Sequence, residues 1–202
     1  MSVAASQPRA DAFVASPHKL DGPYDVAVTE RGSFFGYGDL VVDMRSFVRM
    51  REACNAHGTL LVFDEIPTGL GKTGRFFAAE HDGATPDIVV LGKALGGGVL
   101  PIAACVARDD LNVAGAYAFG HYTHEKNPVT ARAALATLEV IEREGLVENA
   151  AHVGAHAQGR LHEMKRRHPS IGDVRGRGLL LGIELVTDRD AKTPAGDLAE
   201  QT

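Results

Sequence analysis

The sequence contains few cysteines, no long apolar run and no long block of charge of one sign. Its two cysteines, Cys54 and Cys105, lie in apolar or helical surroundings and lack the close Cys and His spacing that a zinc site requires. We therefore expect both to be buried thiols. No stretch approaches the roughly 18 apolar residues of a membrane span, and residues 1–9 have no apolar core of signal-peptide length. These absences argue against a membrane protein and favour the cytoplasm.

The charge composition argues against a nucleic-acid or membrane partner. The chain carries 21 basic and 26 acidic residues, with a formal net charge of −5. Because neither sign forms a long block, no segment is suited to tracking a phosphate backbone or an anionic membrane, and we expect neither as a partner. With 202 residues and 45% hydrophobic content, the chain can bury a sizeable core in one domain or in parts of two.

Apolar periodicity predicts alternating helices and strands from about residue 40 onward, and it predicts no firm structure for residues 1–38. Helices are predicted over 40–56 (ended by Gly58), over 128–144 (begun by Pro128 and ended by Gly145) and over 147–166 (ended by His168 and Pro169). Strands are predicted over 60–63, 88–91, 102–107 and 179–185. The two later helices have predicted apolar stripes, formed by Ala134, Leu135, Leu138 and Ile141 and by Val153, Ala157, Leu161 and Met164.

Two of the predicted strands lead directly into side chains that can take part in catalysis. The strand over 60–63 enters Asp64 and the strand over 88–91 enters Gly92 and Lys93, both after continuous apolar runs typical of strands buried on two faces. Reactive groups of α/β sheets gather at strand ends, so Asp64 and Lys93 are expected in one crevice. An amine that forms a Schiff base and an anion that keeps a pyridine nitrogen protonated are the two groups that pyridoxal 5′-phosphate (PLP) needs.

Residues close to Asp64 and Lys93 in the sequence are suited to contact a flat ring such as that of PLP. On an extended chain Ile66 points the same way as Asp64, so its side chain could lie on a ring whose nitrogen Asp64 holds. Glycines at 96–98 would let the backbone pass close to a bulky ligand. If the strand continues, Glu65 points to the opposite face, and it is interpreted as a carboxylate that either supports the residues of the site or has a structural role.

Four segments resemble class-III aminotransferases, over roughly residues 43–185. Residues 64–74 read Asp-Glu-Ile-Pro-Thr-Gly-Leu-Gly-Lys-Thr-Gly, and residues 86–98 read Pro-Asp-Ile-Val-Val-Leu-Gly-Lys-Ala-Leu-Gly-Gly-Gly, which is similar to the Schiff-base segment of that family. Thr123 precedes Asn127 and an alanine-rich helix, and residues 174–184 resemble the start of the small C-terminal domain.

The resemblance implies a fold-type-I PLP enzyme that works as a homodimer with active sites at the subunit interface. Lys93 would be the Schiff-base lysine and proton carrier, Asp64 would hold the pyridine nitrogen, and Ile66 would pack on the ring. The Thr123 hydroxyl would reach the cofactor phosphate of the neighbouring subunit. The implied reaction transfers an amino group from an amine or amino acid to a keto acid or aldehyde.

The resemblance also implies an α/β fold with a definite division of the chain. Residues 39–144 would form part of the PLP-binding large domain, with a mainly parallel sheet and flanking helices, and residues 145–202 would begin a small α+β C-terminal domain. Residues 1–38 would be an atypical N-terminal segment. Members of the family are about twice this length, so we expect a fragment without the N-terminal and C-terminal parts.

Two alternatives on this scaffold stay open. Pro67 stands where many members have a glutamine, and the segment 120–128 also departs from the commonest transaminase pattern. These departures leave room for a PLP-dependent lyase, which would release ammonia or phosphate without consuming a keto acid. The other alternative is an inactive truncated product.

Other motifs are weaker. Gly71-Lys72-Thr73 resembles the end of a P-loop, but Ile66 stands where the P-loop requires a glycine. His121 and His124 are three residues apart with no third ligand in sight, so no metal site is expected. Arg175 and Arg177 are interpreted as residues of a turn at a domain junction.

Overall fold

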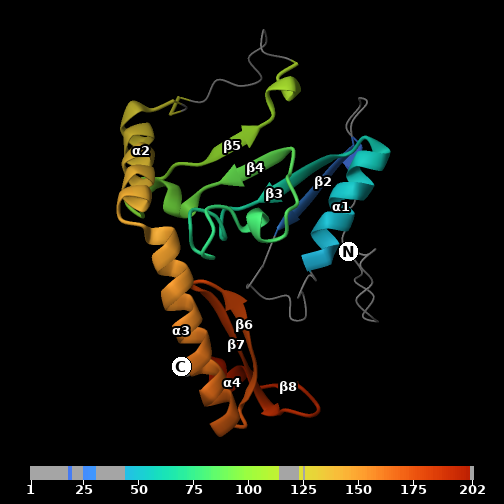
Figure 1. Ribbon diagram of the computed structural model, residues 1–202, viewed down its shortest axis with the longest axis vertical. Helices are drawn as coiled ribbons and strands as arrows, with labels where there is room; N and C mark the ends of the chain where they lie inside the picture. Colours follow the sequence, from blue (N-terminus) through green and yellow to red (C-terminus); the bar gives the residue numbers. More distant parts are fainter. Residues whose placement is uncertain (1–17, 20–24, 31–43, 114–122, 125, 201–202) are drawn as a thin grey trace. The chain divides into compact units, whose positions relative to one another are not determined.

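The computed structural model describes residues 18–19, 25–30, 44–113, 123–124 and 126–200 (Figure 1). The chain forms two compact units. The first comprises residues up to Pro67 together with Ala78–Thr137, and the second comprises Thr68–Phe77 together with Leu138–Thr202. Among the described residues we find no helix with enough apolar length to span a bilayer.

The first unit contains a five-stranded sheet in the order β1-β2-β3-β4-β5. Its strands are β1 (His18–Lys19), β2 (Asp25–Glu30), β3 (Leu60–Asp64), β4 (Ile88–Leu91) and β5 (Ala104–Ala107). The three central strands are parallel, whereas β1 and β5 are antiparallel to their neighbours. The predicted mainly parallel sheet therefore holds for the centre and is wrong at the edges. β2 lies in the segment for which the sequence predicted no firm structure.

The direction of β5 follows from the link that precedes it. Residues 92–103 join β4 to β5 and contain only a 3-10 helix, η3 (Lys93–Gly96). A parallel neighbour needs a crossover over one face of the sheet, usually through an α-helix. β5 therefore turns back beside β4 and forms an edge of the sheet. Cys105 on this strand is exposed, so the prediction of a buried thiol is wrong there.

The parallel strands β2 and β3 are joined through α1 (Met44–His57), close to the helix predicted from the sequence (Figure 1). Phe47 is buried on this helix and meets Phe63 of β3 edge to face, with ring centroids 5.4 Å apart. Gly58 has a φ of 66°, the left-handed conformation that glycine adopts after a helix. Cys54 of α1 is buried as predicted. These contacts form the core beside β3.

The next helix, α2 (Pro128–Arg143), begins at the predicted proline. Asn127 caps it, because the Asn127 Oδ1 accepts a hydrogen bond of 2.9 Å from the backbone N–H two residues further on. Ala134 and Ile141 of the predicted apolar stripe are buried, but Leu135 is exposed. The buried stripe of α2 is therefore narrower than predicted.

In the second unit, α3 (Leu146–Arg167) packs on an antiparallel sheet (Figure 1). The sheet contains β6 (Ile171–Arg177), β7 (Leu180–Asp188) and β8 (Thr193–Pro194), and α4 (Gly196–Glu200) follows it. β7 confirms the strand predicted over 179–185. Arg175 and Arg177 lie in β6, so their assignment to a turn is wrong. The glycine-punctuated residues 175–178 form the end of β6 and the start of the turn into β7.

The buried face of α3 is formed by small residues. Ala150 and Gly154 are buried, whereas Val153 and Met164 of the predicted stripe are exposed. A Cβ atom added at Gly154 would lie 2.1 Å from the carbonyl oxygen of Gly178, so hairpin backbone occupies the place of a side chain. Close backbone packing, rather than apolar bulk, selects this face of the helix.

Residues 68–77 pack against the tip of the β6–β7 hairpin within the second unit. The Leu179 N–H donates a hydrogen bond of 2.9 Å to the Lys72 carbonyl. Gly178 has a φ of 53°, and a Cβ atom there would lie 2.5 Å from the carbonyl carbon of Thr73. A P-loop would open a helix after Thr73, whereas turns and bends lead from here to the 3-10 helix η2 (Ala78–His81). This geometry excludes a P-loop.

Candidate functional site

Strand pairing brings Asp64 and Lys93 to the same edge of the sheet. Asp64, the last residue of β3, pairs with Val90 of the parallel strand β4, and the Glu65 N–H donates a hydrogen bond of 2.9 Å to the Val90 carbonyl. Lys93 follows Val90 by three residues. Parallel strands end at the same edge, so the carboxylate and the amine start from neighbouring positions.

Ile66 lies beside the residue that precedes Lys93. The chain turns directly after β3, because the Asp64 Oδ1 accepts a hydrogen bond of 3.0 Å from the Ile66 N–H, so the expected extended chain through Ile66 is wrong. A Cβ atom added at Gly92 would lie 3.4 Å from the Ile66 Cγ1. The Ile66 side chain therefore covers the Gly92 backbone, next to the lysine.

Lys93 has an unusual backbone conformation for a lysine. It is exposed, begins η3 and has a φ of 47°, in the left-handed region. This conformation costs a residue other than glycine about 1–2 kcal/mol. Strained residues of this kind cluster at functional sites, where the surrounding structure holds them in place. Leu70, Lys126 and Lys192 also have a positive φ, so the place of Lys93 at the strand end, and not its φ alone, makes it a candidate.

Glu65 is buried and organises the backbone around the strand end. Its side chain is 2% exposed. Its Oε2 accepts a hydrogen bond of 3.0 Å from the Ala78 N–H, and its Oε1 accepts one of 2.7 Å from the Ala79 N–H. Both donors open η2. These bonds offset the desolvation of a buried carboxylate.

Asp87, directly before β4, is a buried acid for which the sequence analysis predicts no role. Its carboxylate lies 2.6 Å from the Arg51 Nη1 and 2.8 Å from the Arg108 Nη1, and it accepts a hydrogen bond of 2.7 Å from the Leu61 N–H. Burial by itself raises the pKa of Asp87, but the Leu61 hydrogen bond and the two guanidinium groups outweigh burial and hold this pKa below its ordinary value. The carboxylate therefore stays charged and ties α1 and the end of β5 to β3 and β4.

Thr123 and His124 take no part in this strand pairing. Thr123 and His124 lie in an exposed turn ahead of α2. His121 lies outside the described residues. In the part of the chain that the structure describes, no group of three or more His, Cys, Asp or Glu side chains is placed to hold a metal ion.

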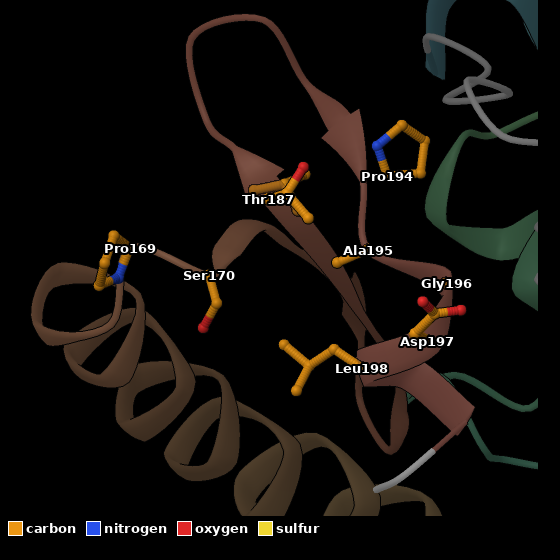
Figure 2. Close-up of a pocket in the computed structure, with 9 residues that line it drawn as sticks. Pro169, Ser170, Thr187, Pro194, Ala195, Gly196, Asp197 and Leu198 are labelled. Atoms are coloured by element: carbon orange, nitrogen blue, oxygen red, sulfur yellow. The ribbon is translucent and has the colours of Figure 1, made fainter.

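The second unit has an open cavity of about 720 Å³ between the end of α3, β7, β8 and α4 (Figure 2). Its polar side chains are those of Ser170, Thr187 and Asp197, and the rest of its lining is apolar or backbone. Because the lining contains no amine, imidazole or thiol, the cavity offers no counterpart of Lys93.

The profile of the family described as Aminotransferase class-III matches residues 36–201. The chain belongs to this family. Its members are PLP-dependent enzymes, among them transaminases, lyases and racemases.

Two curated relatives in this family differ in reaction. The chain is 48% identical over 152 residues to an (R)-1-hydroxy-2-aminoethylphosphonate ammonia-lyase of Vibrio splendidus (strain 12B01), a match that covers 75% of this chain and 32% of the relative. It is 46% identical over 156 residues to a leucine/methionine racemase of Thermococcus litoralis, with coverage of 77% and 35%. The chain thus spans about a third of the length of these relatives.

A solved transaminase structure agrees with the fold. An amine transaminase from an uncultivated Pseudomonas species, in its PLP-bound form, superposes with a TM-score of 0.72 and 33% sequence identity. The superposition covers 78% of this chain and 37% of that one. The mixed α/β fold of this chain is therefore that of part of an aminotransferase.

Proposed function

We propose that this class-III chain carries the lysine-bearing part of a PLP site. Lys93 would hold the cofactor covalently, and Asp64 would face its ring nitrogen. The observation that carries the proposal is the parallel pairing of β3 with β4, which sets a carboxylate and an amine at neighbouring strand ends. The left-handed backbone of Lys93 agrees with this role, because strained residues cluster at functional sites.

The residues present fit the chemistry of this cofactor. When bound, PLP supplies an electron-poor ring that stabilises negative charge on the substrate carbon. The Asp64 carboxylate would keep the ring nitrogen protonated through a charge-assisted hydrogen bond. The Lys93 Nζ would accept the proton of the substrate carbon that bears the amino group and deliver it again. Ile66 would shield one side of the ring from water.

The remaining family assignments belong to the same proposal. Thr123 would donate its hydroxyl to the cofactor phosphate of a neighbouring subunit, which requires a homodimer. Residues 39–144 would be part of the large PLP-binding domain, and residues 145–202 would begin the small C-terminal domain. The substrates would be small amines and keto acids.

Transfer of an amino group to a keto acid or aldehyde is the first candidate reaction. Ammonia elimination is the second, and it is favoured by the 48% identity to an ammonia-lyase. The two reactions differ in what they consume, since only amino transfer requires an acceptor. Both need the same amine and carboxylate at the strand ends.

Product analysis tests the proposal and separates the candidates. The chain with PLP is offered a panel of primary amines, including (R)-1-hydroxy-2-aminoethylphosphonate, with and without pyruvate. Amino transfer predicts alanine formed only with pyruvate, whereas elimination predicts ammonia in either case. The Lys93→Arg variant should lose turnover on the order of 10³-fold.

The matched control is Lys192→Arg, because Lys192 is an exposed lysine that also has a positive φ, of 52°. It should keep the activity of the unsubstituted chain. Turnover that survives Lys93→Arg would contradict the proposed role of this lysine.

A further inference from the structure

The Glu65 carboxylate joins the two stretches of chain on either side of residues 68–77, a segment that we call the excursion. Residues 68–77 belong to the second unit, whereas the chain before and after them belongs to the first. Glu65 lies just before the excursion, and it accepts hydrogen bonds of 3.0 and 2.7 Å from the N–H groups of Ala78 and Ala79, which lie just after it. The carboxylate therefore links the residue that precedes the excursion to the residues that follow it.

Glu65 also lies between the two residues proposed to face the cofactor ring. Its own N–H is bonded to the Val90 carbonyl at 2.9 Å, which fixes its backbone to β4. The residue before it, Asp64, and the residue after it, Ile66, are linked to each other through a hydrogen bond of 3.0 Å. A shift of the Glu65 backbone would therefore move both neighbours.

The excursion has its own attachments, which are independent of the strand end. The Lys72 carbonyl accepts a hydrogen bond from Leu179, and the Gly178 backbone fits closely against Thr73. Only two residues, Ile66 and Pro67, separate Glu65 from Thr68. A displacement of the excursion would consequently be passed along the chain to Asp64 unless the residues on either side of the excursion were held together. Two hydrogen bonds to a buried charged group provide that hold, since such bonds are the stronger kind.

We propose that Glu65 is a positioning residue, which holds Asp64 and Ile66 at the cofactor ring without touching the cofactor. The inference rests on the proposed function, in which Asp64 faces the ring nitrogen. It predicts a selective effect. Loss of Glu65 should weaken the interaction made with the ring nitrogen more than binding of the cofactor in general.

The test compares PLP with its benzenoid analogue, in which a carbon replaces the ring nitrogen. Each is titrated onto the chain and fixed with borohydride, and label at Lys93 is quantified by mass spectrometry. The unsubstituted chain should prefer PLP by about tenfold or more, the size of one charge-assisted contact. Glu65→Ala should reduce this preference at least about fivefold. Glu65→Gln, which keeps one acceptor oxygen, should fall between them.

Glu52→Gln is the matched control, because Glu52 is an exposed glutamate of α1, in the first unit, and its preference should be unchanged. The preference is a ratio of two cofactors on one preparation, so a smaller folded fraction cancels. An equal loss of both cofactors, with the preference intact, would show a merely structural role and overturn the inference. An unsubstituted chain labelled at Lys93 without any preference would overturn it too. No label at Lys93 in that chain would instead overturn the proposed function and, with it, this inference.

Discussion

Side chains of one type occupy very different surroundings in this chain. Cys54 and Cys105 both occur in apolar or helical stretches of the sequence, yet the first is 7% exposed and the second is freely exposed. Burial raises the pKa of the Cys54 thiol, and the charge of Asp87 adds to this, while Arg51 opposes it. Since the thiolate is the nucleophile, the two cysteines should differ in reactivity.

Iodoacetamide near neutral pH should therefore modify Cys105 well before Cys54. Burial both blocks access to Cys54 and lowers its thiolate fraction. Peptide mass spectrometry over time measures the two rates in one sample. In urea, where burial is lost, the rates should converge. Equal rates in the folded chain would contradict the burial of Cys54.

Helices and strands with a strong apolar period were predictable from the sequence, whereas strand direction and the face on which a helix packs were not. The runs around Phe63 and Leu91 identified β3 and β4, and Phe47 and Cys54 marked α1. The antiparallel direction of β5 was missed, because it depends on the link through η3 and not on the strand itself. The prediction of the buried face of α3 was wrong because this face depends on the hairpin that packs against the helix. Gly154 is selected by the close approach of the hairpin, which adds nothing to an apolar pattern.

The candidate site divides in the same way. The neighbouring positions of Asp64 and Lys93 could be predicted because each follows an apolar run, and neighbouring strands align their ends. The partners of Glu65 are backbone N–H groups of alanines, which carry no signal in the sequence. Asp87 acts through Arg51, 36 residues earlier, so no local spacing indicates the pair. Long-range polar contacts are settled by packing.

Asp87 should stabilise the arrangement of the strands in a pH-dependent way. Asp87→Asn leaves the half-buried Arg51 guanidinium without its anion and should lower the free energy of unfolding at neutral pH by on the order of 3 kcal/mol. The pKa of Asp87 is lower in the folded than in the unfolded chain. Its contribution is therefore complete above the unfolded pKa of about 3.9 and is lost as the pH falls through the folded value.

Urea unfolding followed by circular dichroism, repeated at several pH values, measures this contribution. The difference between Asp87→Asn and the unsubstituted chain should shrink below about pH 4. The control is Asp173→Asn, because Asp173 also pairs with two basic residues and has a lowered pKa, but its side chain is 40% exposed. It should cost less than about 1 kcal/mol. A difference for Asp87→Asn that does not change with pH would contradict the account.

At the scale of the whole molecule, the chain belongs to a family of PLP-dependent enzymes whose members catalyse different reactions. The relatives include an ammonia-lyase and a racemase, and a solved relative is an amine transaminase. A shared cofactor chemistry with different outcomes is consistent with one lysine and one carboxylate at the strand ends serving all of them.

Peptide mapping after borohydride reduction with PLP tests the role of Lys93 most directly. Reduction fixes the cofactor to whichever lysine holds it, and the digest identifies that residue. We predict label on the peptide that contains Lys93, lost in Lys93→Arg and retained in Lys192→Arg. Label on another lysine, or on none at saturating PLP, would contradict the assignment of this chain as a PLP-binding part of a class-III enzyme.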